Sequence, residues 1–244
     1  MFKAFRISVL LLILFFVAFG TWLTKARSTD WNNSLWVKVY PINADGSEES
    51  RKHINNLDID DFLAIETFFA REVKKHGHTV ARPVRMELGQ EIREQPPLIS
   101  ETPNMLDIMW WSLKMRWWAG SVAGPQDSPD PDVRIFVRYH APNGQIVLEN
   151  SVGLQKGMIG IVNGYAGRRE SSVNNVIIAH EFLHTLGATD KYEPGTGQPN
   201  FPGGFAQPDL DPRYPQEIAE IMGGRIALSE FDAVVPKSLK YVII

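Results

Sequence analysis

Residues 180–190 read HEFLHTLGATD, and this stretch decides the fold and the chemistry that the chain can support. On a helix that turns about 100° per residue, His180 and His184 lie one turn apart on the same face, so both imidazoles can reach one ion. Glu181 lies beside that face, where its carboxylate can hold a water molecule. Two imidazoles and a carboxylate oxygen suit zinc, and a zinc ion that activates water needs three protein ligands and one open position.

The third ligand must come from beyond the two histidines. Gly187 tolerates the left-handed conformation that ends helices, so the chain can turn sharply there and bring the Asp190 carboxylate back to the metal. Asp190 could instead be a loop or capping residue, in which case Asp209 or Asp211 would supply the ligand. The sequence therefore predicts a Zn²⁺ site formed by the two histidines and Asp190.

The spacing HExxHxxGxxD resembles the zinc signature of metzincin-like metallopeptidases, in the aspartate variant of the snapalysin-type proteases; the commoner metzincin pattern has histidine where Asp190 stands. Met222, within the sequence EIMGG at residues 220–224, is similar in order and spacing to the methionine turn beneath the metal in that family. Alone, it could also be a core methionine before a turn. The gluzincin arrangement is set aside, because residues 203–205, where its glutamate ligand is expected, are Gly-Gly-Phe.

The resemblance implies a metzincin-like zincin domain of the α+β class, with a mixed twisted sheet and an active-site helix. It also implies peptide-bond hydrolysis by a zinc metallopeptidase, an endopeptidase whose substrate is a peptide or protein. Zinc would activate a water molecule, and Glu181 would act as the general base that passes the water proton to the departing amine. Tyr165, Tyr192 and Tyr214 are candidates by position for holding the oxyanion, although each could be a packing or surface residue.

Two other classes of function stay open. The metal could stabilise a catalytically inactive binding or assembly module at the membrane, although a structural site would be closed by a fourth protein ligand and would not need Glu181. The chain could also be a zinc hydrolase that acts on a non-peptide amide, such as a cell-wall component. Nucleic-acid binding is disfavoured because the net charge of −3 is small and the basic residues are scattered. Nothing in the sequence indicates an oligomeric state.

Residues 7–23 form an almost unbroken apolar run that is long enough to cross a bilayer. We expect residues 1–23 to be a transmembrane helix that anchors the chain by a single pass, or a signal peptide whose cleavage gives a secreted protein. Basic residues before the run favour a cytoplasmic N-terminus, although Lys25 and Arg27 beyond it weaken the asymmetry. The catalytic domain is then expected to be extracytoplasmic, in the periplasm or at the cell surface.

A polar tether at residues 24–34 is expected to lead into one domain at residues 35–244, which has room for a sizeable core. The absence of cysteine excludes disulfides and thiolate ligands. The pattern of apolar residues predicts strands at 35–42, 84–88, 133–139, 146–154 and 158–162, and helices at 59–75 and 101–118.

Three finer expectations concern how these elements meet. The strand at 146–154 is predicted to form a hairpin with the strand at 133–139, and the sheet edge near residues 157–164 is predicted to accept a peptide substrate as an added strand. The metal-binding helix is expected to be capped by Ser171 and Ser172.

Two segments allow a structural and a functional interpretation. The helix at 101–118 contains two tryptophan pairs, of which one can face the core; Trp111 and Trp118 could touch a bilayer interface, although a place in the core is the commoner outcome. Residues 193–216 are rich in proline and glycine and are predicted to form a long loop, which either shapes specificity or only connects.

Overall fold

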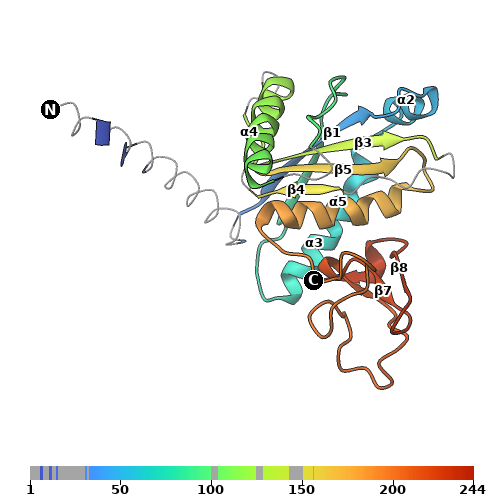
Figure 1. The fold of residues 1–244 in the computed structure, drawn as a ribbon. Coiled ribbons are helices and arrows are strands. Elements are labelled where there is room, and N and C mark those ends of the chain that lie inside the picture. The colour runs from blue at the N-terminus through green and yellow to red at the C-terminus, as the bar shows by residue number, and fades with distance from the viewer. Residues whose placement is uncertain are drawn as a thin grey trace.

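The computed structural model describes residues 33–99, 104–124, 129–142, 151–155 and 157–244, together with residues 6, 7, 11, 12, 15 and 31 (Figure 1). A five-stranded sheet in the order β2-β1-β3-β5-β4 forms its centre. Strands β1, β2, β3 and β5 are parallel, whereas β4 pairs with β5 in the antiparallel direction, so the sheet is mixed. The strand bounds are β1 Leu35–Asn43, β2 Val84–Leu88, β3 Val133–His140, β4 Val152–Leu154 and β5 Ile159–Tyr165.

Helices cover both faces of this sheet, and a segment with little regular structure follows the last helix (Figure 1). The helices are α2 Glu48–Asn55, α3 Leu63–Lys75, α4 Met105–Val122 and α5 Ser171–Leu186, with the 3-10 helix η1 Ile59–Phe62 directly before α3. The C-terminal segment contains only short elements, which are β6 Ala219–Glu220, η3 Ile221–Gly223, β7 Ile226–Ala227, β8 Ala233–Val234, η4 Leu239–Tyr241 and β9 Val242–Ile243.

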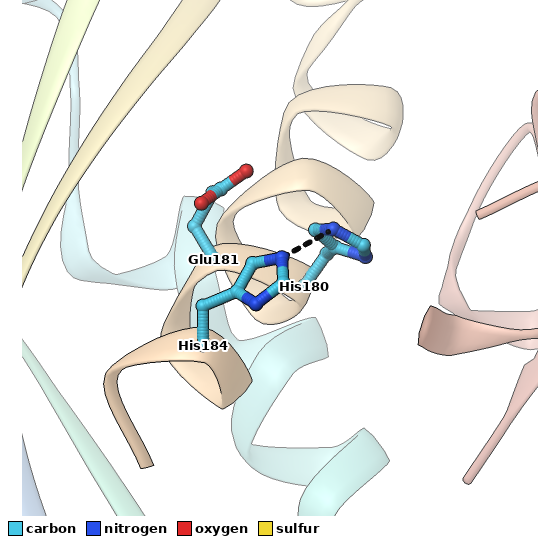
Figure 2. A group of neighbouring side chains, drawn as sticks. All are labelled: His180, Glu181 and His184. Carbon is cyan, nitrogen blue, oxygen red and sulfur yellow. Dashed lines mark hydrogen bonds between the residues drawn. The ribbon is translucent and has the colours of Figure 1, made fainter. Parts of the chain in front are cut away.

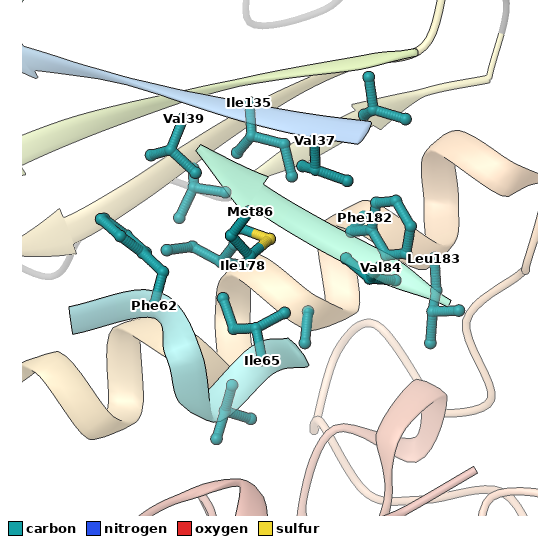
Figure 3. Close-up of a cluster of buried hydrophobic side chains, with 14 of the residues drawn as sticks. Val37, Val39, Phe62, Ile65, Val84, Met86, Ile135, Ile178, Phe182 and Leu183 are labelled. Carbon is teal, nitrogen blue, oxygen red and sulfur yellow. The ribbon is translucent and has the colours of Figure 1, made fainter. Parts of the chain in front are cut away.

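Alternation along the strands creates two apolar layers. In β1, Val37 and Val39 belong to the core that lies against α3 and α5, whereas Tyr40 and Ile42 point to the opposite face, against α4. Figure 3 shows the first of these layers, in which strand residues meet Phe182 of α5. Because both faces of the central strands are largely buried, most of their residues are apolar, with a few partly buried charged residues such as Lys38, Arg134 and Arg138 among them.

Helix α5 is fixed along its whole length. Phe182 is 1% exposed and packs edge-on against Phe69 of α3, with ring centroids 5.1 Å apart. At the other end, the Asn174 side chain accepts a hydrogen bond from the N–H of Tyr165 and donates one to its carbonyl, which ties the first turn of α5 to the end of β5. Truncation of a side chain buried like Phe182 costs about 3–5 kcal/mol, so this packing holds the metal-binding motif firmly in place.

Most of the expected elements are confirmed, and the differences concern how they pair. The predicted hairpin is wrong, because β4 pairs with β5, which lies parallel to β3. The predicted peptide-accepting edge is also wrong, because β5 lies between β3 and β4, and β4 is the edge strand. Helix α2 was not expected, since its sequence is mostly polar. The serine caps are corrected too: Glu170 precedes α5 without a side-chain cap, and the Ser171 hydroxyl donates to the Gly167 carbonyl.

The transmembrane helix expected at residues 1–23 is not supported, whereas the expected α+β class with a mixed sheet is confirmed. Among the residues that the structure describes, no helix is long and apolar enough to cross a membrane. The longest described helix, α4, has 18 residues but contains Asp107, Lys114 and Arg116, and charges at such spacing are costly within a bilayer. Most of residues 1–34 lie outside the described residues, and of the expected tether only residues 31, 33 and 34 are described.

The tryptophans of α4 separate into one inward and one outward pair, as the sequence predicted. Trp118 is buried, and Trp111 is partly buried and donates through Nε1 to the Pro97 carbonyl. Trp110 and Trp117 are the exposed pair. Of the two alternatives for Trp111 and Trp118, the place in the core is confirmed and contact with a bilayer interface is wrong, because both pack toward the protein.

Candidate metal centre

The two histidines of α5 converge on one point. Their Nε2 atoms lie 3.0 Å apart, and their rings meet nearly at right angles with centroids separated by 4.7 Å (Figure 2). Both side chains are mostly buried, because β4 and the C-terminal segment flank this part of the helix. The helical spacing therefore does what the sequence predicts and directs two imidazole nitrogens to a single position.

Backbone carbonyls determine which ring nitrogen of each histidine carries a proton. Nδ1 of His180 lies 2.8 Å from the carbonyl oxygen of Ile221, and Nδ1 of His184 lies 2.8 Å from that of Ala188. A carbonyl oxygen can only accept, so each Nδ1–H donates and each Nε2 is left with its lone pair when the ring is neutral. Two lone pairs 3.0 Å apart require a shared proton or a cation between them.

Asp190 completes the convergence. Helix α5 ends at Gly187, which has φ of 100° and is followed by a hydrogen bond from the Ala188 N–H to the Leu183 carbonyl. This turn brings Oδ1 of Asp190 to 3.2 Å from Nε2 of His180 and 3.1 Å from Nε2 of His184. The alternative donors, Asp209 and Asp211, are exposed, and among the described contacts neither forms an ion pair with the histidines.

The separation of these three atoms fits a bound metal ion. Ligands about 2.0–2.1 Å from an ion at tetrahedral angles lie about 3.3 Å from one another. The three observed separations, 3.0, 3.1 and 3.2 Å, are close to that value. The second ring nitrogen of each histidine is also held by an outer hydrogen bond, which is the usual support of a metal-binding imidazole.

Glu181 lies beside the two histidines rather than between them (Figure 2). His180, Glu181 and His184 form a group that could hold a metal ion, with one ligand atom from each lying within 4.8 Å of the others. Asp190 Oδ1 also lies 3.1–3.2 Å from Nε2 of both imidazoles and could supply a donor atom to the same position. The Glu181 carboxylate is buried, and its Oε2 has no hydrogen-bond partner among the described residues, so its capacity for a hydrogen bond is unused.

The electrostatics of the cluster follow from burial and proximity. Burial raises the pKa of Glu181 to about 7, with attraction from His180 opposing the rise and repulsion from Asp190 adding to it. Burial lowers the pKa of His180, but Asp190, the Ile221 carbonyl and Glu181 outweigh that effect and the net shift is upward. The pKa of Asp190 is lowered, chiefly by its hydrogen bond to His180. A positive charge at the centre of the cluster is thus favoured.

The segment after Asp190 is tied to the turn that contains Met222. The Lys191 N–H donates to the Met222 carbonyl at 2.9 Å, and the Lys191 ammonium lies 2.8 Å from Oε1 of Glu220. Oε2 of Glu220 accepts from the Gly223 N–H at 2.6 Å. Met222 itself is buried in the main core. These bonds fix the Ile221 carbonyl against His180 and Asp190 against both histidines.

Only one of the three candidate tyrosines reaches the centre. The Tyr192 ring lies 6.4 Å from the His180 ring, and its pKa is raised by burial and then by Asp190 and Glu181. The Tyr165 N–H bonds to Asn174 at the end of β5, and the Tyr214 ring packs against Phe205. Sequence reasoning did not find the carbonyls of Ile221 and Ala188, because a backbone atom carries no residue-type signal.

Comparison with known proteins adds no assignment. No family model matches the chain, and no curated protein matches it. The interpretation of the site therefore depends on its geometry and on the spacing of its residues.

Proposed function

We propose that this protein is a zinc-dependent peptidase in which His180, His184 and Asp190 hold the ion and Glu181 is the general base. The observation that carries the proposal is the convergence of three donor atoms within 3.0–3.2 Å, while the other nitrogen of each imidazole is committed to a backbone carbonyl. The HExxHxxGxxD spacing, which resembles the aspartate variant of the metzincin-like signature, supports the same assignment.

The donor set favours zinc among the common metal ions. Neutral imidazole suits zinc, whereas calcium and magnesium prefer sites built from oxygen atoms alone. When bound, the ion would supply Lewis-acid activation of water and of the substrate carbonyl. Three protein donors leave the fourth position for these groups.

Residues of the chain would carry out proton transfer, orientation of the imidazoles and stabilisation of the oxyanion. Glu181 accepts the proton of a water molecule at its unpartnered Oε2 and delivers it to the departing amine. Asp190 and the carbonyls of Ile221 and Ala188 hold the two imidazoles in one orientation. Tyr192, beside His180, is the side chain placed to donate a hydrogen bond to the developing oxyanion.

Strand β4 supplies a place for a peptide backbone. It lies at the edge of the sheet and runs over α5 so closely that a methyl group at Gly153 would come within 2.7 Å of the Glu181 carbonyl oxygen and 3.3 Å of its Oε2. A peptide that adds to the outer edge of β4 by main-chain hydrogen bonds would therefore pass the Glu181 carboxylate. This corrects the edge proposed from sequence by one strand.

The test compares the zinc-loaded full chain with its Glu181→Gln variant on a peptide library. Because Gln cannot take the water proton, we expect a loss of turnover of about 10²–10⁴-fold with one zinc still bound per chain. The matched control is Glu217→Gln, which removes an exposed carboxylate elsewhere in the C-terminal segment and should leave cleavage unchanged.

Two outcomes would contradict the proposal. Cleavage that survives Glu181→Gln would exclude this carboxylate as the base. Zinc binding without cleavage of any library peptide would exclude a peptidase; the spectrum of a cobalt-substituted sample would then distinguish a closed four-ligand structural site from an open site that acts on another amide.

A further inference from the structure

A cavity of about 350 Å³ opens beside His180, on the side of the metal centre that faces the C-terminal segment. Val176 and Ile177 of α5, Ile221 of η3 and Val235 form its apolar wall. Because His180 belongs to both the cavity and the metal centre, a substrate held at the metal has this space next to its reacting bond. The volume is large enough for one long side chain.

Arg225 is the permanently charged residue that lines this cavity. Its position is set by the turn after η3: Gly224 adopts φ of 71°, and the Arg225 N–H donates to the Gly223 carbonyl at 2.9 Å. Its guanidinium lies against Gly197, where a methyl group would be 2.9 Å from Cζ of Arg225. Gly197 thus leaves the space that the guanidinium occupies.

The guanidinium of Arg225 has no acidic partner within the part of the chain that the structure describes. The described ion pairs in this segment are made by its neighbours, such as Lys191 with Glu220. A guanidinium presents a fork of donors that matches a carboxylate, and an apolar wall around it strengthens that interaction. The cavity therefore combines room for an aliphatic stem with a cation for an acidic end.

We propose that this cavity holds the substrate side chain next to the scissile bond and that Arg225 selects an acidic residue, glutamate or aspartate, at that position. The inference rests on the proposed peptidase function and specifies its substrate class. Arg225 acts here as a specificity-determining residue and takes no part in the bond cleavage itself. Since Arg225 is exposed to solvent, the preference for Glu over its neutral isostere Gln is expected to be modest, about tenfold in kcat/KM.

The experiment uses pairs of peptides that differ only by Glu or Gln at the residue that adjoins the cleaved bond, with the zinc-loaded full chain as enzyme. The parent should cleave the Glu peptide about tenfold faster by kcat/KM, Arg225→Gln should remove the difference, and Arg225→Glu should reverse it. Arg85→Gln is the matched control, because it removes one exposed positive charge on β2 and should keep the preference. Zinc content and melting temperature should be equal in all four proteins.

The outcomes separate this inference from the proposed function. A parent enzyme that cleaves both peptides equally, or an Arg225→Gln variant that keeps the preference, overturns the role of Arg225 and leaves the peptidase standing. If the parent cleaves neither peptide, the peptidase proposal fails. Calorimetric titration then measures how tightly the parent and Arg225→Gln bind the same two peptides, which tests whether the cavity prefers an acidic side chain. Tighter binding of the Glu peptide, lost in Arg225→Gln, supports the cavity assignment, whereas equal or absent binding overturns it.

Discussion

Helix α5 and the C-terminal segment, residues 188–244, build opposite sides of the same metal centre by different means. The helix is a 16-residue element whose side chains are buried in the main core. The segment contains only strands of two residues and 3-10 turns of three, and separate backbone bonds such as Lys191 N–H to Met222 carbonyl position its contributions. The histidines are thus held by a long buried helix, whereas Asp190 and the Ile221 carbonyl are positioned by separate hydrogen bonds and by the burial of Ile221 and Met222.

This difference implies that the metal and the C-terminal segment stabilise each other. A bound ligand stabilises the folded form of the segments that contribute to its binding site, relative to their locally unfolded form. Most of the main core comes from the sheet, α3 and α5, and the C-terminal segment adds only a few residues to it, so the sheet and α5 are expected to keep their structure without the ion. The following predictions test that division.

Removal of the metal should have the largest effect. With zinc at about 1,000 times its dissociation constant, chelation should lower the free energy of unfolding by about 4 kcal/mol. Hydrogen exchange should show the loss of protection first at amides of the C-terminal segment, such as Lys191 and Asn200, while amides of β3 stay protected. An equal loss of protection throughout the described residues would refute the division.

Asp190→Ala should weaken zinc binding by at least about 100-fold, because it removes one of three donors and outer-shell changes alone cost 10–100-fold. Asp209→Ala is the control, since Asp209 is exposed and was the alternative donor. Zinc titration with a competing chelator measures both variants. Full occupancy in Asp190→Ala at low free zinc would show that the C-terminal segment supplies a different ligand.

Gly153→Ala and Gly160→Ala compare two glycines that face each other across β4 and β5. A methyl group at Gly153 would collide with Cβ of His184, whereas one at Gly160 would meet the Ile135 side chain at an ordinary 3.5 Å. We expect Gly153→Ala to cost about 1–3 kcal/mol and to weaken zinc binding. Gly160→Ala should be neutral or stabilising by less than about 1 kcal/mol. Urea unfolding measures both, and equal costs would contradict the close packing of β4 on α5.

The smallest effect concerns the hydrogen bonds of the Asp45 carboxylate, which lies far from the proposed metal site. Burial acts to raise the pKa of Asp45, but hydrogen bonds from the N–H groups of Ala141 and Ser47 outweigh it and lower the pKa to about 2. The carboxylate therefore stabilises the fold above about pH 4, and that contribution is lost as the pH falls toward 2.

Asp45→Asn should accordingly cost less than about 1 kcal/mol near neutral pH, because solvent screens this exposed group. The difference from the parent should disappear as urea unfolding is repeated toward pH 2, and chelation should not change it. The prediction would be contradicted if the difference in the free energy of unfolding between Asp45→Asn and the parent grew on acidification. It would also be contradicted if that difference vanished when the metal was removed, because the stability of the sheet would then depend on the metal site.

The same contrast between regions explains which features of the fold could be predicted. The strand at residues 84–88 was placed at its observed bounds, because its sequence VRMEL alternates apolar and charged residues, as expected of a strand with one face in the core. Helix α2 was missed because it is short and polar, with the sequence EESRKHIN. The pairing of β4 with β5 could not be read from the sequence, since a run of apolar residues does not specify which neighbour it joins.

Within the candidate site, His180, Glu181 and His184 could be predicted because their arrangement depends on local helix geometry alone. Asp190 was predicted as the third donor with Asp209 and Asp211 as alternatives, and the structure shows that the turn at Gly187 brings its carboxylate to both imidazoles. The Tyr192 position, the exposed tryptophan pair and the cavity at Arg225 had no distinguishing sequence signal. Each of them depends on which elements pack together.

The amino-acid sequence by itself determined the side-chain chemistry of the centre and the one-turn spacing of its histidines, because a helix fixes the direction of residues four apart whatever surrounds it. Only the tertiary structure decided that the carbonyl of Ile221, 41 residues from His180, orients that ring, and that Arg225 lines the adjoining cavity. Contacts between residues so far apart depend on the packing of the whole domain, which no local pattern of residues encodes.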